Sequence, residues 1–213
     1  LRGFNSPVDR YLRGEEVELQ PGVLAGFNLF MGKATCGTCH FAPAFSGLVP
    51  PLYQENESEV LGVLTAPGSR ELDADKGRLV SGRLQDEAAF YERSFKTLTV
   101  RNVALTAPYF HNGKYETLEE VVEFYNHGGA AGIGLELPNQ TLPPDSLNLS
   151  AEEQKALVAF MEALTDTTGM TALPKRLPAF EIRESFTLKF FNSESEKYIS
   201  KLVRFSLIIL RVY

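Results

Sequence analysis

The chain has 213 residues, enough for one domain with an extension or for two small domains. Its 27 Asp and Glu residues outnumber the 21 Lys and Arg residues, and the resulting net charge of -6 argues against the basic surface that nucleic-acid binding requires. Hydrophobic residues make up 44% of the chain, which is ordinary for a packed core, and the 2 cysteines are too few for a disulfide framework.

Neither end of the chain has the pattern of a membrane segment. Residues 1–20 carry charges throughout, so we expect a linker or extension there and no signal peptide. The first residue, Leu1, is not Met, which suggests a processed or truncated product. Residues 202–213 are apolar, but Arg204 and Arg211 interrupt a stretch that is already shorter than the ~20 residues of a span. No membrane span is therefore expected.

Three segments have the pattern of amphipathic helices. The first covers residues 21–33, with Pro21 at a favourable first position and apolar residues at helical spacing. The second begins with a capping box at residues 117–120 and stops at Gly128. The third begins with another capping box at residues 150–153 and runs to residue 164.

The segments between these helices have no regular pattern of apolar and polar residues. Prolines and glycines break any period from residue 41 to about residue 82, and a loop of that length usually wraps a ligand or forms a site. No strong alternation of apolar and polar residues is seen before residue 180. We therefore expect an all-α domain with long loops. Residues 172–213 form a C-terminal extension of unknown role, rich in Phe and Ile after Pro178, with the pattern of a strand and a terminal helix.

Both cysteines lie in one short motif, Cys36-Gly37-Thr38-Cys39-His40. This Cys-x-x-Cys-His pattern is the attachment signature of haem c: two thiols in one turn add to the vinyl groups, and the adjacent imidazole binds the iron. A redox dithiol would need a βαβ setting, and a zinc site would need four ligands. The sequence therefore predicts one covalent haem c, held by Cys36, Cys39 and His40.

The second axial ligand determines what the iron can do, because a closed site transfers electrons whereas an open one reacts with peroxide or oxygen. Tyr125 lies on the apolar face of the second helix, since it follows Leu118 by seven residues. Its phenol therefore points inward, and the iron is one candidate partner for the hydroxyl. The alternative is a core tyrosine whose hydroxyl bonds to a haem propionate or to the backbone. The other candidates are three methionines and two histidines. We expect Met31 and Met161 to lie in the core, Met170 in a loop beyond the last helix, and His127 in solvent. His111 is also a candidate.

At residues 96–129 the chain resembles the C-terminal haem domain of bacterial dihaem cytochrome c peroxidases and of the MauG-like enzymes related to them. The resemblance covers roughly residues 20–170. It is carried by the Cys-x-x-Cys-His motif, by the Asp-Lys-Gly-Arg sequence at residues 75–78, and by the run from Arg101 through His111 to Glu120. It implies a cytochrome c-like haem domain over residues 21–171.

The resemblance also implies roles for particular residues. Its MauG-like members have a tyrosine ligand at the place where this chain has Tyr125. A calcium ion between the two haems is implied at the backbone carbonyls of Thr106 and Pro108, and we expect Arg101 and His111 to contact haem propionates. The resemblance implies that the family's second haem, where hydrogen peroxide reacts, lies in an N-terminal peroxidatic domain, and we expect that domain to be outside these residues.

The leading hypothesis is that the chain is the electron-transferring domain of a dihaem peroxidase. Its haem would receive electrons from a small donor protein of the cytochrome c or cupredoxin type. One alternative is a MauG-like oxidase acting on a protein or small molecule, which a tyrosine ligand favours. Another is a stand-alone monohaem cytochrome c, against which the long loop and the Thr-x-Pro segment argue. Covalent haem c implies a periplasmic or otherwise exported location.

Overall fold

The computed structural model describes residues 3–81 and 88–170, and residues up to Met170 form one compact unit. The elements are α1 (Pro7–Leu12), α2 (Val23–Met31), the 3-10 turn η1 (Cys36–Thr38), β1 (Ser58–Val60), η2 (Arg78–Ser81), α3 (Ala88–Tyr91), β2 (Ser94–Lys96), η4 (Val103–Leu105), α4 (Leu118–Asn126), α5 (Gly129–Gly132) and α6 (Ala151–Ala163). The extension predicted over residues 172–213 lies outside the described residues.

The three helices predicted from the sequence are confirmed as α2, α4 and α6. In α4, Thr117 accepts a hydrogen bond from the Glu120 amide, and the Glu120 side chain accepts one from the Thr117 amide. Ser150 and Glu153 close the start of α6 in the same way. Both capping boxes therefore act where the sequence placed them, because they satisfy amide donors that the first turn leaves open.

Residues 1–20, expected from the sequence to be a linker or extension, contain a short helix. Residues 7–12 form α1, which a capping box between Ser6 and Asp9 opens. Val8 on this helix is only 5% exposed and belongs to the main hydrophobic core. The start of the described chain is thus part of the folded unit.

The all-α expectation also needs correction, because β1 and β2 form a two-stranded antiparallel sheet. Glu59 pairs with Phe95 in its centre. The irregular segment from residue 41 onward therefore contains a strand, and isolated bridges such as Leu48 with Asn56 fasten other parts of it. Strands of three residues are too short to show an alternation that could be recognised in the sequence.

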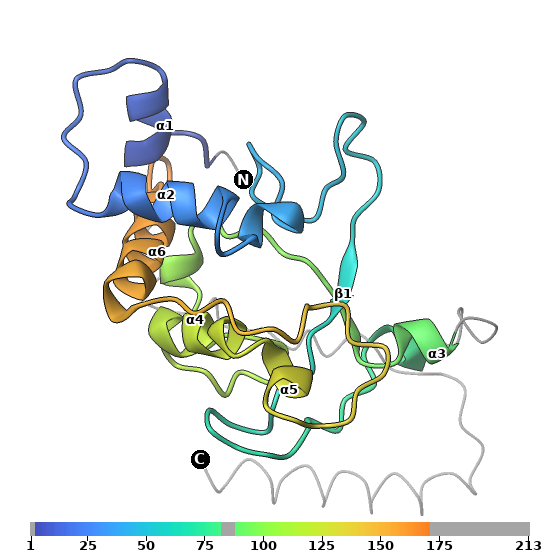
Figure 1. Ribbon diagram of the computed structural model, residues 1–213. Coiled ribbons are helices and arrows are strands. Elements are labelled where there is room, and N and C mark those ends of the chain that lie inside the picture. Colours follow the sequence, from blue (N-terminus) through green and yellow to red (C-terminus); the bar gives the residue numbers. More distant parts are fainter. Residues whose placement is uncertain (1–2, 82–87, 171–213) are drawn as a thin grey trace, which may run out of the picture. The chain divides into compact units, whose positions relative to one another are not determined.

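The main core lies where α2 packs on α6, with α4 on another side of α6 (Figure 1). The Phe160 ring is at its centre, within 5.2 to 5.6 Å of the rings of Phe27, Phe30 and Phe45, measured between centroids. These are tilted or edge-to-face contacts, the arrangement that aromatic pairs prefer. Because Phe45 follows the Cys-x-x-Cys-His motif closely, this core directly supports the predicted haem attachment.

Gly26 makes the close approach of α2 and α6 possible. A Cβ atom at this position would overlap the backbone carbonyl of Ala156 on α6. We expect Gly26→Ala to destabilise the protein by about 2 kcal/mol, because an overpacking cost of about 3 kcal/mol outweighs the gain of about 1 kcal/mol in helix propensity. Chemical denaturation of the haem-loaded chain measures this. Leu24→Ala, on the exposed face of the same helix, is the control and should change little. A more stable Gly26→Ala variant would contradict this helix contact.

Candidate haem site

The motif residues are brought together by one tight turn after α2. Thr35 adopts a left-handed backbone (φ 53°) and starts η1, and the amides of Cys39 and His40 both donate to the carbonyl of Cys36. Both cysteines are free thiols and half-buried. Burial raises the pKa of the Cys36 thiol to about 12, so it is protonated at neutral pH. Two neutral thiols and an imidazole thus share one turn.

The His40 imidazole is enclosed by protein and is held in its neutral form. Its Nδ1 atom is buried and makes no hydrogen bond in the described part of the chain. Burial lowers the pKa of the imidazole, which keeps it neutral, while the nearby backbone carbonyls of Phe45 and Leu98 act in the opposite direction. A neutral imidazole is the form that binds iron. The Phe30 ring lies 6.2 Å away and limits how the imidazole can move.

Tyr125 comes from α4 and faces the same space. Burial is the main cause that raises its pKa, and charges at Cys36, Cys39 and Glu59 add to the effect, which places these groups near its phenol. Tyr125 is partly buried and packs against the second apolar cluster, beside Phe110 and Phe124. The structure therefore brings the predicted ligand to the predicted attachment turn.

These observations test whether the residues fit a haem. One turn carries two free thiols and an imidazole whose buried Nδ1 atom has no partner among the described residues, and the Tyr125 phenol of α4 lies near both thiols. Two thiols that can bond to the vinyl groups, with an imidazole and a phenol that can bind iron, are the groups that a covalently held haem requires. The site therefore fits haem c.

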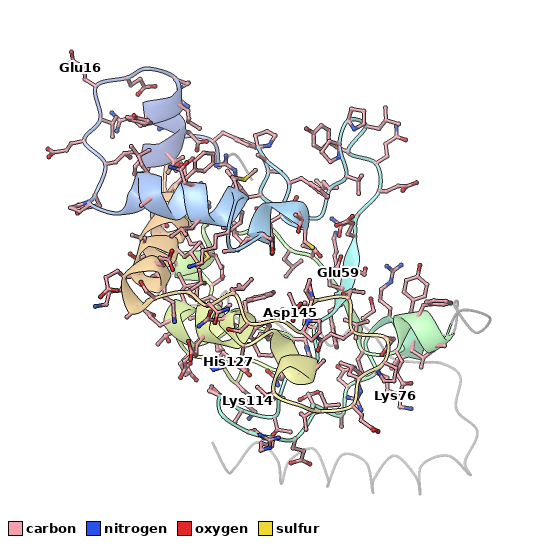
Figure 2. The ribbon with its side chains drawn as sticks, viewed as in Figure 1. Glu16, Glu59, Lys76, Lys114, His127 and Asp145 are labelled. Atoms are coloured by element: carbon pink, nitrogen blue, oxygen red, sulfur yellow. The ribbon has the colours of Figure 1, made fainter. Side chains whose placement is uncertain are left out.

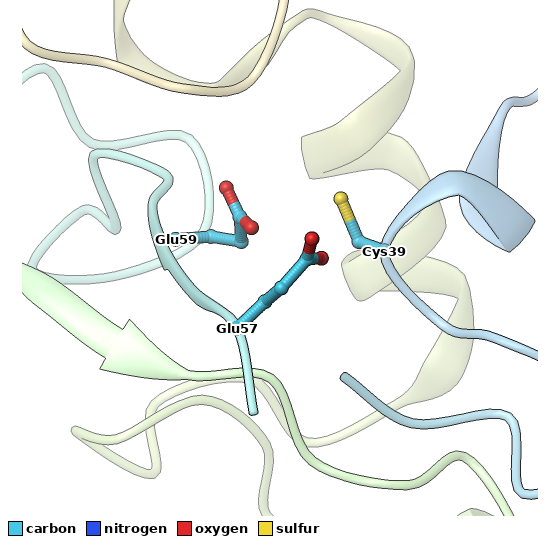
Figure 3. A group of neighbouring side chains, drawn as sticks. All are labelled: Cys39, Glu57 and Glu59. Carbon is cyan, nitrogen blue, oxygen red and sulfur yellow. The ribbon is translucent and has the colours of Figure 1, made fainter. Parts of the chain in front are cut away.

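Two carboxylates beside Cys39 were missed by the sequence analysis. Figure 3 shows Glu57 and Glu59 turned toward Cys39, and one oxygen of each lies within 4.8 Å of its Sγ atom and of the other. Burial raises the pKa of Glu57, and the charge of Glu59 raises it further. The sequence did contain a sign that these two carboxylates lie together. Glu57 and Glu59 are separated by one residue, and every second residue of an extended segment faces the same side. Figure 2 shows Glu59 on β1.

The other sulfur and histidine candidates lie in different environments. Met161 is 7% exposed and belongs to the core, as predicted. His127 is exposed and hydrogen-bonds through Nδ1 to the Glu123 carbonyl, as predicted for a solvated residue (Figure 2). Met31 was expected in the core, but it is 45% exposed. It lies on the last turn of α2, and its side chain packs against Gly37.

Arg101 and His111 have protein partners. Arg101 makes a buried two-point ion pair with Asp9, with N–O distances of 2.8 and 2.9 Å. His111 Nε2 lies 3.2 Å from Asp73 Oδ1, and its ring stacks on Phe95 at 3.7 Å between centroids. Their contacts with haem propionates stay predictions.

The implied calcium ligands lie next to η4. Thr106 and Pro108 are exposed and flank the Ala107–Pro108 peptide, which is cis. Their carbonyls accept no backbone hydrogen bond within the described residues, so both oxygens are free to bind a cation there. The calcium site stays a prediction.

No helix among the described residues is long and apolar enough to cross a bilayer. No family model matches the chain. Among curated proteins, the chain is 35% identical over 176 residues to the cytochrome-c peroxidase IdrP1 of Pseudomonas sp. (strain SCT), covering 75% of this chain and 44% of that protein. It is 28% identical over 171 residues to the methylamine utilization protein MauG of Methylorubrum extorquens, covering 80% and 42%.

A solved structure of a MauG-like protein associated with microbial copper homeostasis superposes with a TM-score of 0.60 and 28% identity, covering 76% of this chain and 52% of that one. The diheme peroxidase BthA from Burkholderia thailandensis shares the fold, with a TM-score of 0.53. The chain spans about half the length of the curated relatives it matches. Its predicted kinship is thereby confirmed: the chain is a homologue of the dihaem cytochrome c peroxidases and MauG proteins.

Proposed function

We propose that this chain is the electron-transferring haem domain of a dihaem peroxidase. The observation that supports the proposal is that Tyr125, on α4, lies near the two thiols of the turn that also carries His40. A ligand on each side closes the iron, and a closed iron passes electrons without binding peroxide. The names of the relatives as cytochrome c peroxidases support the reaction class.

Each residue of the site has a distinct task. Cys36 and Cys39 would hold the haem, each through a thioether bond in which the sulfur takes one carbon of a vinyl group and the thiol proton the other. When bound, the haem would supply one-electron chemistry at its iron. His40 and Tyr125 would be the ligands of that iron, and the buried Phe30 ring packs beside His40. The protein thus holds one redox centre in a fixed and closed environment.

The proposal places the peroxide reaction outside this chain. Electrons arrive singly from a small cytochrome c or cupredoxin-type donor and leave to a second haem in an N-terminal peroxidatic domain, where two electrons and two protons reduce hydrogen peroxide to water. The net charge of -6 suits a basic donor. Covalent haem and the exported character of such enzymes support a periplasmic location.

A MauG-like oxidase is the second candidate, and the charges around the site favour it. A phenolate ligand stabilises oxidised iron better than a thioether does. The carboxylates of Glu57 and Glu59, next to Cys39, add negative charge that favours the more positive oxidised state. Both effects lower the reduction potential, which suits a centre that is held in oxidised form.

Replacing both cysteines by serine tests covalent attachment. We expect Cys36→Ser/Cys39→Ser to lose all haem that survives denaturing electrophoresis, because a serine hydroxyl does not add to a vinyl group under these conditions. Thr38→Ala, in the same turn, is the control and should keep its haem. Covalent haem in the double variant would contradict the assignment.

Tyr125→Phe tests the second ligand. Without the phenol, the ferric iron loses its charge-transfer band and changes its spin state, which absorption and EPR spectra of the purified chain would show. Tyr115→Phe is the matched control, because it removes a buried hydroxyl from the same apolar cluster. Identical ferric spectra for wild type and Tyr125→Phe would rule out Tyr125 as the ligand.

Peroxide turnover tests the division of labour. The haem-loaded 213-residue chain should reduce peroxide at well below the kcat of about 10 per second that is typical of enzymes, because both axial positions are filled. Tyr125→Phe should turn over faster than wild type, since it opens one position. Turnover by the wild-type chain at the typical enzymatic rate, measured with a chemical electron donor, would overturn the proposal.

A further inference from the structure

The loop that follows the haem motif is fastened by a neighbouring segment, bond by bond. We call residues 43–47 the proximal loop and residues 97–101 the clamp. The three successive carbonyls of the loop, from Pro43 to Phe45, accept bonds from Arg101 Nε at 2.9 Å, from Thr99 Oγ1 at 2.6 Å and from the Val100 amide at 2.9 Å. A fourth bond joins the Gly47 amide to the clamp at the Thr97 carbonyl, at 3.2 Å. The loop therefore has little freedom.

The clamp is itself held by a buried ion pair. Arg101 and Asp9 pair through two bonds, and their side chains are only 8% and 10% exposed. The same guanidinium donates to the Gly3 carbonyl and lies over the rings of Phe4 and Phe45, at 4.3 and 5.4 Å. Arg101 thus joins the N-terminal segment, the clamp and the proximal loop in one contact. Only a planar fork with several donors can do this, so a lysine would not replace it.

One residue of the proximal loop, Phe45, lies next to His40. Phe45 packs on Phe30 at 5.9 Å between ring centroids, and Phe30 packs on the His40 ring. The carbonyls of Phe45 and Leu98, one from the loop and one from the clamp, lie near the imidazole, whose Nδ1 atom is buried and unpaired. A shift of the loop would therefore rotate the imidazole or move its nearest acceptors.

We propose that the Asp9–Arg101 ion pair is a positioning device that sets the orientation of the His40 imidazole through the proximal loop, and thereby the reduction potential of the haem. The device rests on the covalent haem of the proposed function, but it does not depend on which reaction that haem serves. Partners that orient a metal-binding histidine tune the properties of the metal, typically by about tenfold or more. Asp9 and Arg101 are positioning residues, since neither is a ligand of the iron.

The test compares variants of the haem-loaded chain by EPR g-values and midpoint potential. Arg101→Gln removes the fork. Arg10→Gln is the matched control, because it removes the same charge from an exposed ion pair with Glu15 on α1. We expect Arg101→Gln to change the g-values and to change the ratio of reduced to oxidised haem about tenfold at a fixed solution potential, or about 59 mV for one electron. Arg10→Gln should match wild type.

Three further variants separate orientation from charge and from folding. The double variant Asp9→Asn/Arg101→Gln leaves no uncompensated buried charge and should shift in the same way as Arg101→Gln. Arg101→Lys keeps the charge but loses the fork, so it should remain shifted. Thr99→Val removes one clamp bond and leaves the ion pair intact, so it should shift less and in the same direction.

The inference is overturned if folded, haem-loaded Arg101→Gln and Thr99→Val both keep wild-type g-values and potential, or if Arg101→Lys restores them fully. Should Arg101→Gln fail to fold, Thr99→Val decides alone. A wild-type chain without covalent haem would overturn the proposed function and this inference together, whereas equal spectra in haem-loaded variants would overturn the inference only.

Discussion

One turn of backbone has to present two thiols and an imidazole to the same flat ring, and the other features of the site are arranged around that requirement. The left-handed conformation of Thr35 and the amide bonds to the Cys36 carbonyl bring the three groups onto one turn. Such a turn has little stability of its own. It is held because α2 leads into it and the Phe30 and Phe45 rings that flank it are packed against Phe160 of α6.

The packing of α2 on α6 therefore has a chemical purpose as well as a structural one. Gly26 lets the two helices approach closely, and the aromatic rings fill the space on the side toward His40. From the other side α4 supplies Tyr125, whose orientation follows from helical spacing and from a capping box that fixes where the helix begins. A rigid core on one side and a fixed helix on the other are suited to electron transfer, because little has to reorganise when the iron changes its charge.

The charges of the site act in one direction. A phenol that faces the thiols, and two carboxylates next to Cys39, all favour the more oxidised and more positive iron. In contrast, the one strongly buried cation of the described chain that contacts the proximal loop, Arg101, is neutralised by Asp9. Its role is consequently mechanical, and this distinguishes it from a group that tunes the haem by its field.

The sequence by itself determined the features that depend on neighbours along the chain. The haem motif, the capping boxes of α4 and α6 and the inward face that carries Tyr125 are all patterns within a few turns of backbone. Only the tertiary structure decided that residues 7–12 belong to the core, that Glu57 and Glu59 meet Cys39, and that Arg101 pairs with Asp9. The reason is physical: Arg101 and Asp9 are far apart in the chain, and no local periodicity records a contact made when distant segments pack together.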